Sequence, residues 1–183
     1  MNRIYTDSGK IISVYDGLFD FHNRQHFYMF AQSSLFRIGW ADGAIVENQA
    51  NRFIHSIYSC EDIDRLGIID AILKSEAARE LDGYKIDRAV LNLSTAADTN
   101  YVHTHGEDKI LLYYVNLEWH DGWHGETMFF NDNLRDVAFA GIYTPGRLIA
   151  FDPKIPHSIR PQSHIATQYR FTLAIILNKQ DNS

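Results

Sequence analysis

The chain has 183 residues, of which 45% are hydrophobic and 22% are charged, and its 17 basic and 23 acidic side chains give a formal net charge of −6. A chain of this length can bury a hydrophobic core without help from a metal or a disulfide, so we expect a single globular domain over residues 1–183. The acidic balance excludes the basic stripe of a nucleic-acid-binding surface, and we expect no nucleic-acid partner.

Cysteine usage and hydropathy bear on the cellular compartment. Cys60 is the only cysteine, so the chain cannot form an internal disulfide, which is typical of a reducing environment. The first residues contain no apolar run of signal-peptide length, and no segment approaches a membrane span. We therefore expect a cytoplasmic protein without a membrane partner. The sequence carries no signal for the oligomeric state.

The N-terminal part, from about residue 16 to 82, has the spacing of supporting helices and follows a short apolar strand at Lys10–Tyr15. Asp20 can cap a helix over Phe21–Ser33, because its carboxylate can accept a hydrogen bond from the first turn. Apolar residues at helical spacing predict a second helix over Asp62–Leu81. We interpret these helices as scaffold.

From about residue 85 to 178 the chain changes to short β-rich runs that are separated by turn residues. Seven strands are predicted here: Ile86–Leu93, Lys109–Asn116, Glu126–Phe130, Ala138–Ile142, Arg147–Phe151, His157–Ile159 and Tyr169–Leu177. Helices first and strands second predict an α+β fold, with helices against one face of a double-layered sheet. The specific expectation is a jelly roll, that is, a cupin-like double-stranded β-helix.

A cluster of histidines and carboxylates precedes the strand at Lys109–Asn116. Within it, His105 and Glu107 are two residues apart, so on an extended segment both side chains can point at one ion. His157 follows about fifty residues later. Two imidazoles and one carboxylate on one side of a metal leave other coordination positions open, which is the facial triad of non-haem iron(II) oxygenases.

Two alternatives to this ligand set remain open from the residues alone. In a register shifted by two residues, His103 is the first ligand and His105 takes the carboxylate position, which gives three imidazoles with His157. Asp108 also competes with Glu107 as the anionic ligand. We favour His105, Glu107 and His157, because this set keeps two neutral donors and one anion.

The order of the surrounding motifs carries a family resemblance. After His105-Gly106-Glu107 the chain reads Leu112-Tyr113-Tyr114-Val115-Asn116 with Trp119, then His124-Gly125-Glu126-Thr127, Thr144-Pro145-Gly146-Arg147 leading to Phe151, Pro156-His157, and Tyr169-Arg170-Phe171. In this order the motifs resemble the prolyl 4-hydroxylase-like branch of the 2-oxoglutarate- and iron(II)-dependent dioxygenases. The resemblance covers about residues 85–178 and extends loosely over the N-terminal helices.

This resemblance implies a hydroxylase that uses Fe(II), dioxygen and the cosubstrate 2-oxoglutarate, and it makes ascorbate a candidate reductant. Arg170 would bind the far carboxylate of 2-oxoglutarate through paired donors. The hydroxyl of Tyr114 would donate to the same carboxylate, and Tyr113 would take its place if the register shifted by one residue. The chain departs from the family pattern at Glu107, where Asp is usual, and at His124, where Gly is usual.

The resemblance suggests a peptidyl proline, or another residue of a peptide or protein, as substrate, and a small molecule is nearly as well supported. Loops at Ile38–Asn51 and Glu118–Trp123 are the segments available to line a substrate groove. The rival interpretation is a cupin-like metal-binding protein that acts as an isomerase or as a non-catalytic ligand-binding module. Arg170 discriminates between them, because an isomerase needs no clamp for 2-oxoglutarate.

Overall fold

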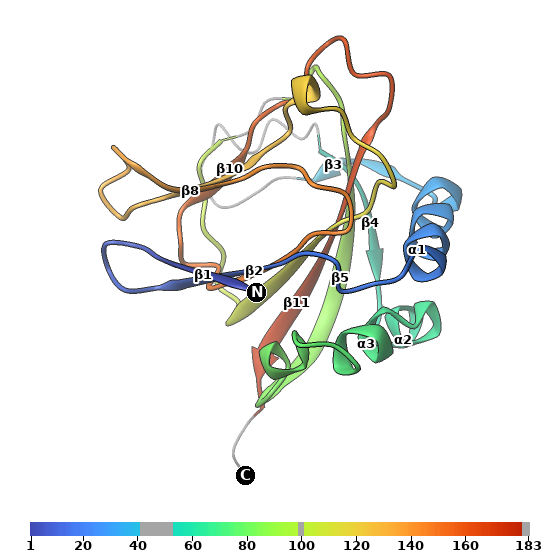
Figure 1. Ribbon diagram of the computed structural model, residues 1–183, viewed down its shortest axis with the longest axis horizontal. Helices are drawn as coiled ribbons and strands as arrows, with labels where there is room; N and C mark the ends of the chain where they lie inside the picture. The colour runs from blue at the N-terminus through green and yellow to red at the C-terminus, as the bar shows by residue number, and fades with distance from the viewer. Residues whose placement is uncertain (41–52, 99–100, 181–183) are drawn as a thin grey trace.

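The structure is a computed structural model that describes residues 1–40, 53–98 and 101–180 (Figure 1). Most of the predicted substrate loop at Ile38–Asn51 lies outside these residues. No helix in the described part of the chain has the length and apolar character that a bilayer crossing needs.

Most strands form one antiparallel sheet of eight strands, in the order β1-β2-β9-β6-β11-β5-β4-β3. Its strands are β1 (Asn2–Tyr5), β2 (Ile11–Tyr15), β3 (Arg37–Trp40), β4 (Phe53–Tyr58), β5 (Tyr84–Ser94), β6 (Lys109–Tyr114), β9 (Leu148–Phe151) and β11 (Arg170–Lys179). The two longest strands, β5 and β11, pair with each other near the centre of the sheet.

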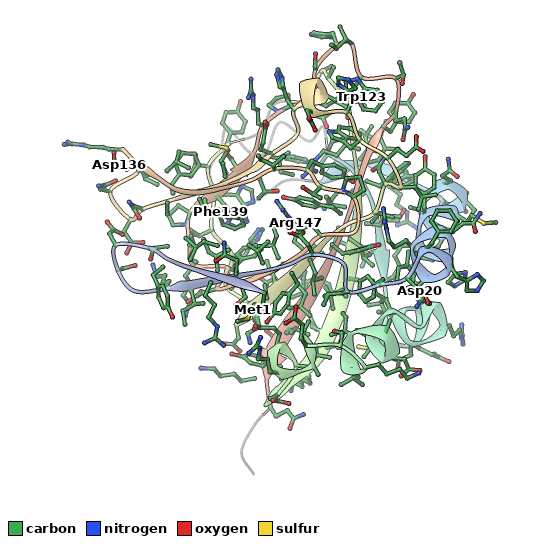
Figure 2. All side chains as sticks on the ribbon, in the orientation of Figure 1. Met1, Asp20, Trp123, Asp136, Phe139 and Arg147 are labelled. Carbon is green, nitrogen blue, oxygen red and sulfur yellow. The ribbon has the colours of Figure 1, made fainter. Side chains whose placement is uncertain are left out.

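A second antiparallel sheet has the order β10-β7-β8. Its strands are β7 (Thr127–Phe130), β8 (Val137–Gly141) and β10 (His157–Ile159). In Figure 1, β8 and β10 lie on the side of the molecule opposite the helices. Figure 2 shows Asp136 at the tip of the β7–β8 hairpin and Trp123 in the short helical turn η3 (Asp121–Trp123). The two sheets together form the double-stranded β-helix expected from the strand pattern.

The helices cover the outer face of the large sheet beside β4, β5 and β11 (Figure 1). They are α1 (Phe21–Ser33), α2 (Cys60–Leu66), α3 (Ile68–Leu73) and the turn η2 (Ala78–Glu80). One hydrophobic core lies between the helices and this face, and includes Phe27, Ile72 and Leu173. A second core lies between the two sheets, and includes Leu112, Phe129 and Ile149.

The predicted elements agree with the structure in the C-terminal part and only partly in the N-terminal part. The helix at Phe21–Ser33 and its Asp20 cap are confirmed, since the carboxylate accepts from the backbone N–H of Asn23 at 2.8 Å. The predicted continuous helix at Asp62–Leu81 is wrong, because Gly67 takes a left-handed conformation with φ 75° that ends α2 and begins α3.

The expectation of a mostly helical segment from 16 to 82 is also wrong for β3 and β4. The run Phe53–Tyr58 is rich in aromatic and β-branched residues, which suit a half-buried strand, and it extends the large sheet beyond β5.

Alternation along β6 and β11 decides which residues reach the space between the sheets. In β6, Leu111 and Tyr113 belong to the core under the helices, whereas Leu112 and Tyr114 belong to the core between the sheets. In β11, Thr172 pairs with Tyr114 across the sheet. Tyr114 therefore faces the space between the sheets, and Tyr113, its alternative in a shifted register, faces the helices.

Candidate active site

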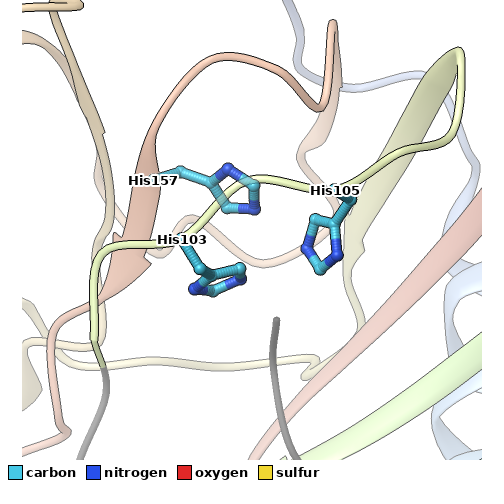
Figure 3. Close-up of side chains that lie close together, drawn as sticks. All are labelled: His103, His105 and His157. Atoms are coloured by element: carbon cyan, nitrogen blue, oxygen red, sulfur yellow. The ribbon is translucent and has the colours of Figure 1, made fainter. Parts of the chain in front are cut away.

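Three imidazoles converge between the two sheets: His103, His105 and His157 (Figure 3). Each offers one ring nitrogen, and these nitrogens all lie within 4.8 Å of one another. Backbone hydrogen bonds place the three residues. His103 and His157 form an antiparallel bridge, with N–H to carbonyl distances of 2.9 and 3.0 Å, and the backbone N–H of His105 donates to the carbonyl of Pro153 at 3.0 Å.

Two of the rings are oriented by backbone carbonyls. The Nδ1 of His157 lies 2.8 Å from the carbonyl oxygen of Ile155, and the Nδ1 of His103 lies 2.9 Å from that of Tyr101. Because a carbonyl oxygen only accepts, each Nδ1 carries a proton and donates it, which fixes the orientation of the two rings. Burial and the neighbouring His103 hold the pKa of His157 well below its usual value, so this ring is neutral near neutral pH.

Glu107 lines the same cavity as the imidazoles but has a partner of its own. Its carboxylate forms an ion pair with Arg88 of β5, with 2.7 Å between Oε1 and Nη2. Burial acts to raise the pKa of Glu107, but a hydrogen bond from its own backbone, the Arg88 hydrogen bond and the nearby charge of His105 outweigh it and leave the pKa below the usual value. Glu107 is therefore an ionised carboxylate beside the cluster, in contact with a guanidinium.

Asp108 points to another part of the molecule. Its carboxylate accepts from the backbone N–H of Lys179 at 2.8 Å, and it lines a separate cavity together with Lys109 and Asp152. The structure brings His105, Glu107 and His157 of the favoured set to one cavity, adds His103 to the two imidazoles, and leaves Asp108 apart.

The cavity has a volume of about 180 Å³ and lies between the sheets, with the imidazoles in its wall. Part of the lining is apolar: Val90, Ile110, Leu112, Phe151, Ile159, Ala174 and Ile176. The hydroxyl-bearing residues Thr127 and Thr172 are buried at 1% and 0% exposure, whereas Arg88, Asn92 and Glu107 are only half-buried. The cavity therefore has a closed end at the threonines and an accessible end at Arg88 and Glu107.

Arg170 lies behind the lining residue Thr127 at the closed end and is fully buried. Its Nε donates to the carbonyl of Gly125 at 2.8 Å and its Nη2 to the hydroxyl of Thr127 at 3.3 Å. The guanidinium also lies 4.8 Å from the centre of the Tyr143 ring, as a cation–π contact. Burial lowers the pKa of Arg170, yet a guanidinium remains charged near neutral pH.

This buried cation lacks an anion. Within residues 1–40, 53–98 and 101–180, no carboxylate lies within ion-pair distance of Arg170, and its Nη1 and the hydroxyl of Thr172 have no hydrogen-bond partner. A buried charge without a counterion costs several kcal/mol, on the order of what a bound anion would return. The closed end thus fits a ligand with a carboxylate.

Tyr114 is held beside this cation. Its hydroxyl lies 2.8 Å from the hydroxyl of Thr127 and 3.0 Å from the carbonyl of Gly141, and its ring stacks on Tyr143 at 4.5 Å. Burial raises its pKa, so the hydroxyl stays protonated and can donate. Tyr113, the fallback considered from sequence, faces the helices and is not available to the cavity.

Gly125 and Trp119 close the wall behind Arg170. A Cβ at Gly125 would lie 3.0 Å from Cδ and 3.2 Å from Nε of Arg170, and its φ is +87°, so only glycine allows this approach. The Trp119 indole N–H donates to the carbonyl of His124 at 2.8 Å, and its ring packs against Tyr143. In the loop Glu118–Trp123, Trp119 is therefore a packing residue rather than an exposed groove residue.

Sequence reasoning missed two groups of cavity residues. Arg88, Val90 and Asn92 alternate on one face of β5 and reach the cavity, and this period of two was readable within the predicted strand. The unpartnered hydroxyl of Thr172 follows from the same alternation, two residues after Arg170. The pairing of Arg88 with Glu107 had no local signal, because it joins a residue of β5 to one in the segment before β6.

No protein-family model and no curated protein matches the chain. Solved structures do match it in shape. A prolyl hydroxylase from Trichoplax adhaerens, in complex with a hypoxia inducible factor peptide, aligns with a TM-score of 0.61 at 16% identity, over 92% of this chain and 83% of that one. A viral collagen prolyl hydroxylase from Paramecium Bursaria Chlorella virus-1 aligns with a TM-score of 0.64 at 15% identity, over 99% and 96%.

A third similar structure has a different reaction in its name. The non-haem α-ketoglutarate-dependent epimerase SnoN, from nogalamycin biosynthesis, aligns with a TM-score of 0.63 at 9% identity, over 92% of this chain and 77% of that one. Similarity at these identities concerns the fold. The chain has the double-stranded β-helix fold of the prolyl hydroxylases and of this epimerase, so the resemblance predicted from the motifs is confirmed at the level of the fold.

Proposed function

We propose that this protein is an iron(II)- and 2-oxoglutarate-dependent dioxygenase, built as one domain over residues 1–183, that hydroxylates an unactivated C–H bond. The observation that carries the proposal is a cavity with three imidazoles in its wall, together with a buried guanidinium that contacts the lining residue Thr127 and has no ion-pair partner among the described residues. A metal at the imidazoles and a dicarboxylate reaching toward Arg170 satisfy both features at once. The fold shared with 2-oxoglutarate-dependent enzymes supports this assignment.

We propose His103, His105 and His157 as the residues that would hold the metal. Imidazole nitrogen suits first-row divalent metals, including iron(II), and backbone carbonyls already fix two of these rings through Nδ1. The set predicted first from sequence shares His105 and His157, and differs in having Glu107 as the third ligand. Glu107 stays a candidate ligand, but its pairing with Arg88 favours the three-imidazole set.

When bound, iron(II) together with 2-oxoglutarate supplies the activation of dioxygen, and the protein's own residues do the positioning. Arg170 offers its unpartnered Nη1 to the far carboxylate of 2-oxoglutarate, and the hydroxyls of Thr127 and Tyr114 are next to it. Since Gly125 and the Tyr143 ring hold the guanidinium, little reorganisation is needed when the anion arrives.

The apolar lining has a separate task. Ile110, Leu112 and Phe151 are 3 to 8% exposed and form the cavity wall. They exclude water from the reacting centre, which protects a reactive oxidant from side reactions. No side chain is needed as a strong general base for such chemistry.

For the substrate we propose a residue of a peptide or protein, with peptidyl proline as the first candidate. The support is that a structurally similar prolyl hydroxylase was solved with a peptide bound. The substrate carbon would enter at the accessible end of the cavity, where the half-buried Asn92 and Glu107 lie.

The test is turnover of the purified chain with iron(II), 2-oxoglutarate and ascorbate, followed as succinate formation, together with screening of peptides and metabolites for a mass gain of one oxygen atom. Wild type should form succinate, and His103→Ala should not. A chain that binds no divalent metal at the imidazoles, or that binds metal but not 2-oxoglutarate, is not an oxygenase of this class, and the ligand-binding module then becomes the better interpretation.

Epimerisation is the second candidate, because one similar structure is a 2-oxoglutarate-dependent epimerase. Both reactions use the same cosubstrate and the same metal position, so succinate alone does not separate them. The product does: hydroxylation adds an oxygen atom to the substrate, whereas epimerisation leaves the substrate mass unchanged and inverts one stereocentre.

A further inference from the structure

Glu107 is in an unusual position for an ionised carboxylate. It lines the same cavity as His103, His105 and His157, and it follows His105 by two residues. Carboxylate oxygen is a good ligand for divalent first-row metals. A free carboxylate in this place would therefore compete for the metal, or for one of the coordination positions that 2-oxoglutarate and dioxygen need.

Arg88 forms an ion pair with the Glu107 carboxylate. Its side chain comes from β5 on the face that also presents Val90 and Asn92 to the cavity, and its Nη2 lies 2.7 Å from Oε1 of Glu107. The other guanidinium nitrogen, Nη1, forms an ion pair with Asp87. The guanidinium thus pairs with two carboxylates, and the side chains of Arg88 and Glu107 are 32% and 19% exposed. Among the described residues, the ligand atoms that lie within 4.8 Å of one another are those of the three imidazoles, and the Glu107 carboxylate paired with Arg88 is not one of them.

We propose that Arg88 is a positioning residue that keeps Glu107 off the metal, so that the metal has three neutral protein ligands and its remaining positions stay open. The inference rests on the proposed function and deepens it. Three imidazoles leave the full charge of a divalent ion uncompensated, which favours the dianionic cosubstrate. A fourth, anionic protein ligand would remove one unit of that charge and one open position.

A purely structural role makes a different prediction. A half-exposed Arg–Glu pair contributes little to stability, and under a purely structural role its loss would leave the metal's ligand set unchanged. The ligand set of the metal, rather than stability or activity, is therefore the decisive observable.

The experiment uses Co(II) in place of iron, because the absorption bands of Co(II) report the number and kind of its ligands. The metal-free chain is titrated with Co(II), first alone and then in the presence of 2-oxoglutarate, for wild type and for the variants Arg88→Met, Glu107→Gln and the double variant. Arg65→Met is the matched control, since Arg65 forms a comparable 2.6 Å pair with Glu61 on the exposed surface of α2.

In Arg88→Met the released carboxylate should join the metal. We expect Co(II) to bind roughly tenfold more tightly, on the scale of other changes to the surroundings of metal ligands, with altered absorption bands and weaker 2-oxoglutarate binding. Glu107→Gln should keep the wild-type spectrum, and the double variant should return to it. Arg65→Met should match wild type throughout.

Two results overturn the inference while leaving the proposed function in place. If Arg88→Met has the wild-type spectrum and Co(II) affinity, Arg88 does not control the ligand set. If Glu107→Gln alone changes the spectrum and loses metal affinity, Glu107 is already a ligand in the wild type. If wild type binds no Co(II) at all, the proposed function fails together with the inference, so the two failures are distinguishable.

Discussion

Strand β11 places Phe171, Leu173, Ile175 and Leu177 on the face covered by the helices, and Arg170 and Thr172 on the face toward the cavity. On the helix side every one of these side chains is apolar and belongs to one continuous core. On the cavity side, within the described residues, Nη1 of Arg170 and the hydroxyl of Thr172 have no hydrogen-bond partner. The helix side of β11 is therefore wholly apolar, whereas the cavity side also carries polar groups that have no partner among the described residues.

Two buried charged side chains among the described residues, Glu80 and Arg170, repeat this contrast. On the helix side, the Glu80 carboxylate accepts from the Tyr15 hydroxyl at 2.5 Å and from Lys109 at 3.2 Å, so its charge is satisfied. Between the sheets, Arg170 is more deeply buried and has no anion among the described residues. A buried charge without a counterion is costly, which makes Arg170 a candidate for binding an anion. Four predictions test this contrast.

His157→Ala should have the largest effect on function and little effect on the fold. The ring is neutral, buried and held for ligation by the Ile155 carbonyl. Removing a metal ligand should lower Co(II) or iron(II) affinity by more than about 100-fold, which exceeds the loss typical of outer partners. Metal titration measures this, with circular dichroism as the check on folding. Unchanged metal affinity would rule out His157 as a ligand.

Leu173→Ala should have the largest effect on stability and none on the site. Leu173 is 2% exposed in the core under the helices, and such a truncation costs about 2–5 kcal/mol. Thr172→Val, one residue away on the other face, removes a hydroxyl without a partner and should cost nothing. Urea denaturation compares the two variants. Equal losses of stability would mean that the two faces do not differ as described.

Arg170→Met should separate function from stability. Loss of the guanidinium should weaken 2-oxoglutarate binding by about 2 kcal/mol or more, roughly 30-fold. The melting temperature of the ligand-free chain should stay the same or rise, because an uncompensated buried charge has been removed. Calorimetric titration with 2-oxoglutarate and a thermal melt give the two numbers, and Arg160→Met, at an exposed arginine, is the control. Unchanged 2-oxoglutarate affinity would contradict the role given to Arg170.

The strands of the double-stranded β-helix could be predicted because each has its own alternating or apolar run between turn residues. The predicted Ile86–Leu93 and Arg147–Phe151 correspond closely to β5 and β9. The elements of the N-terminal half of the chain were harder to predict. Apolar residues at helical spacing on both sides of Gly67 gave no hint of the break, and β4 is a short run that gains its place only by pairing with β5.

The residues of the candidate site likewise fall into those that the sequence predicts and those that it does not. The motif order pointed to His105, His157, Tyr114 and Arg170, and the directions of Tyr114 and Arg170 follow from alternation within β6 and β11. Sequence could not choose between the His103 and Glu107 registers. That choice depends on the bridge of His103 to His157 and on the pairing of Arg88 with Glu107, and both join segments that are distant in sequence.

Glu80→Gln should have the smallest effect and should appear mainly as a change in pH dependence. Burial acts to raise the pKa of Glu80, but hydrogen bonds from Tyr15 and Lys109 and the charge of Lys109 outweigh it, so the pKa lies below its usual value. The unfolded chain then takes up the proton first as pH falls. The contribution of this carboxylate to the free energy of unfolding is therefore complete above about pH 4.3, the pKa in the unfolded chain, and is lost as pH falls through the lower pKa of the folded chain.

Glutamine cannot titrate, so the Glu80→Gln variant should be about 1 kcal/mol less stable at neutral pH and should show a flatter loss of stability toward acid. Unfolding free energies from pH 7 to 3 measure this, with the exposed Glu61→Gln as control. Parallel curves for wild type and Glu80→Gln would show that Glu80 is not the satisfied charge that the contrast with Arg170 requires.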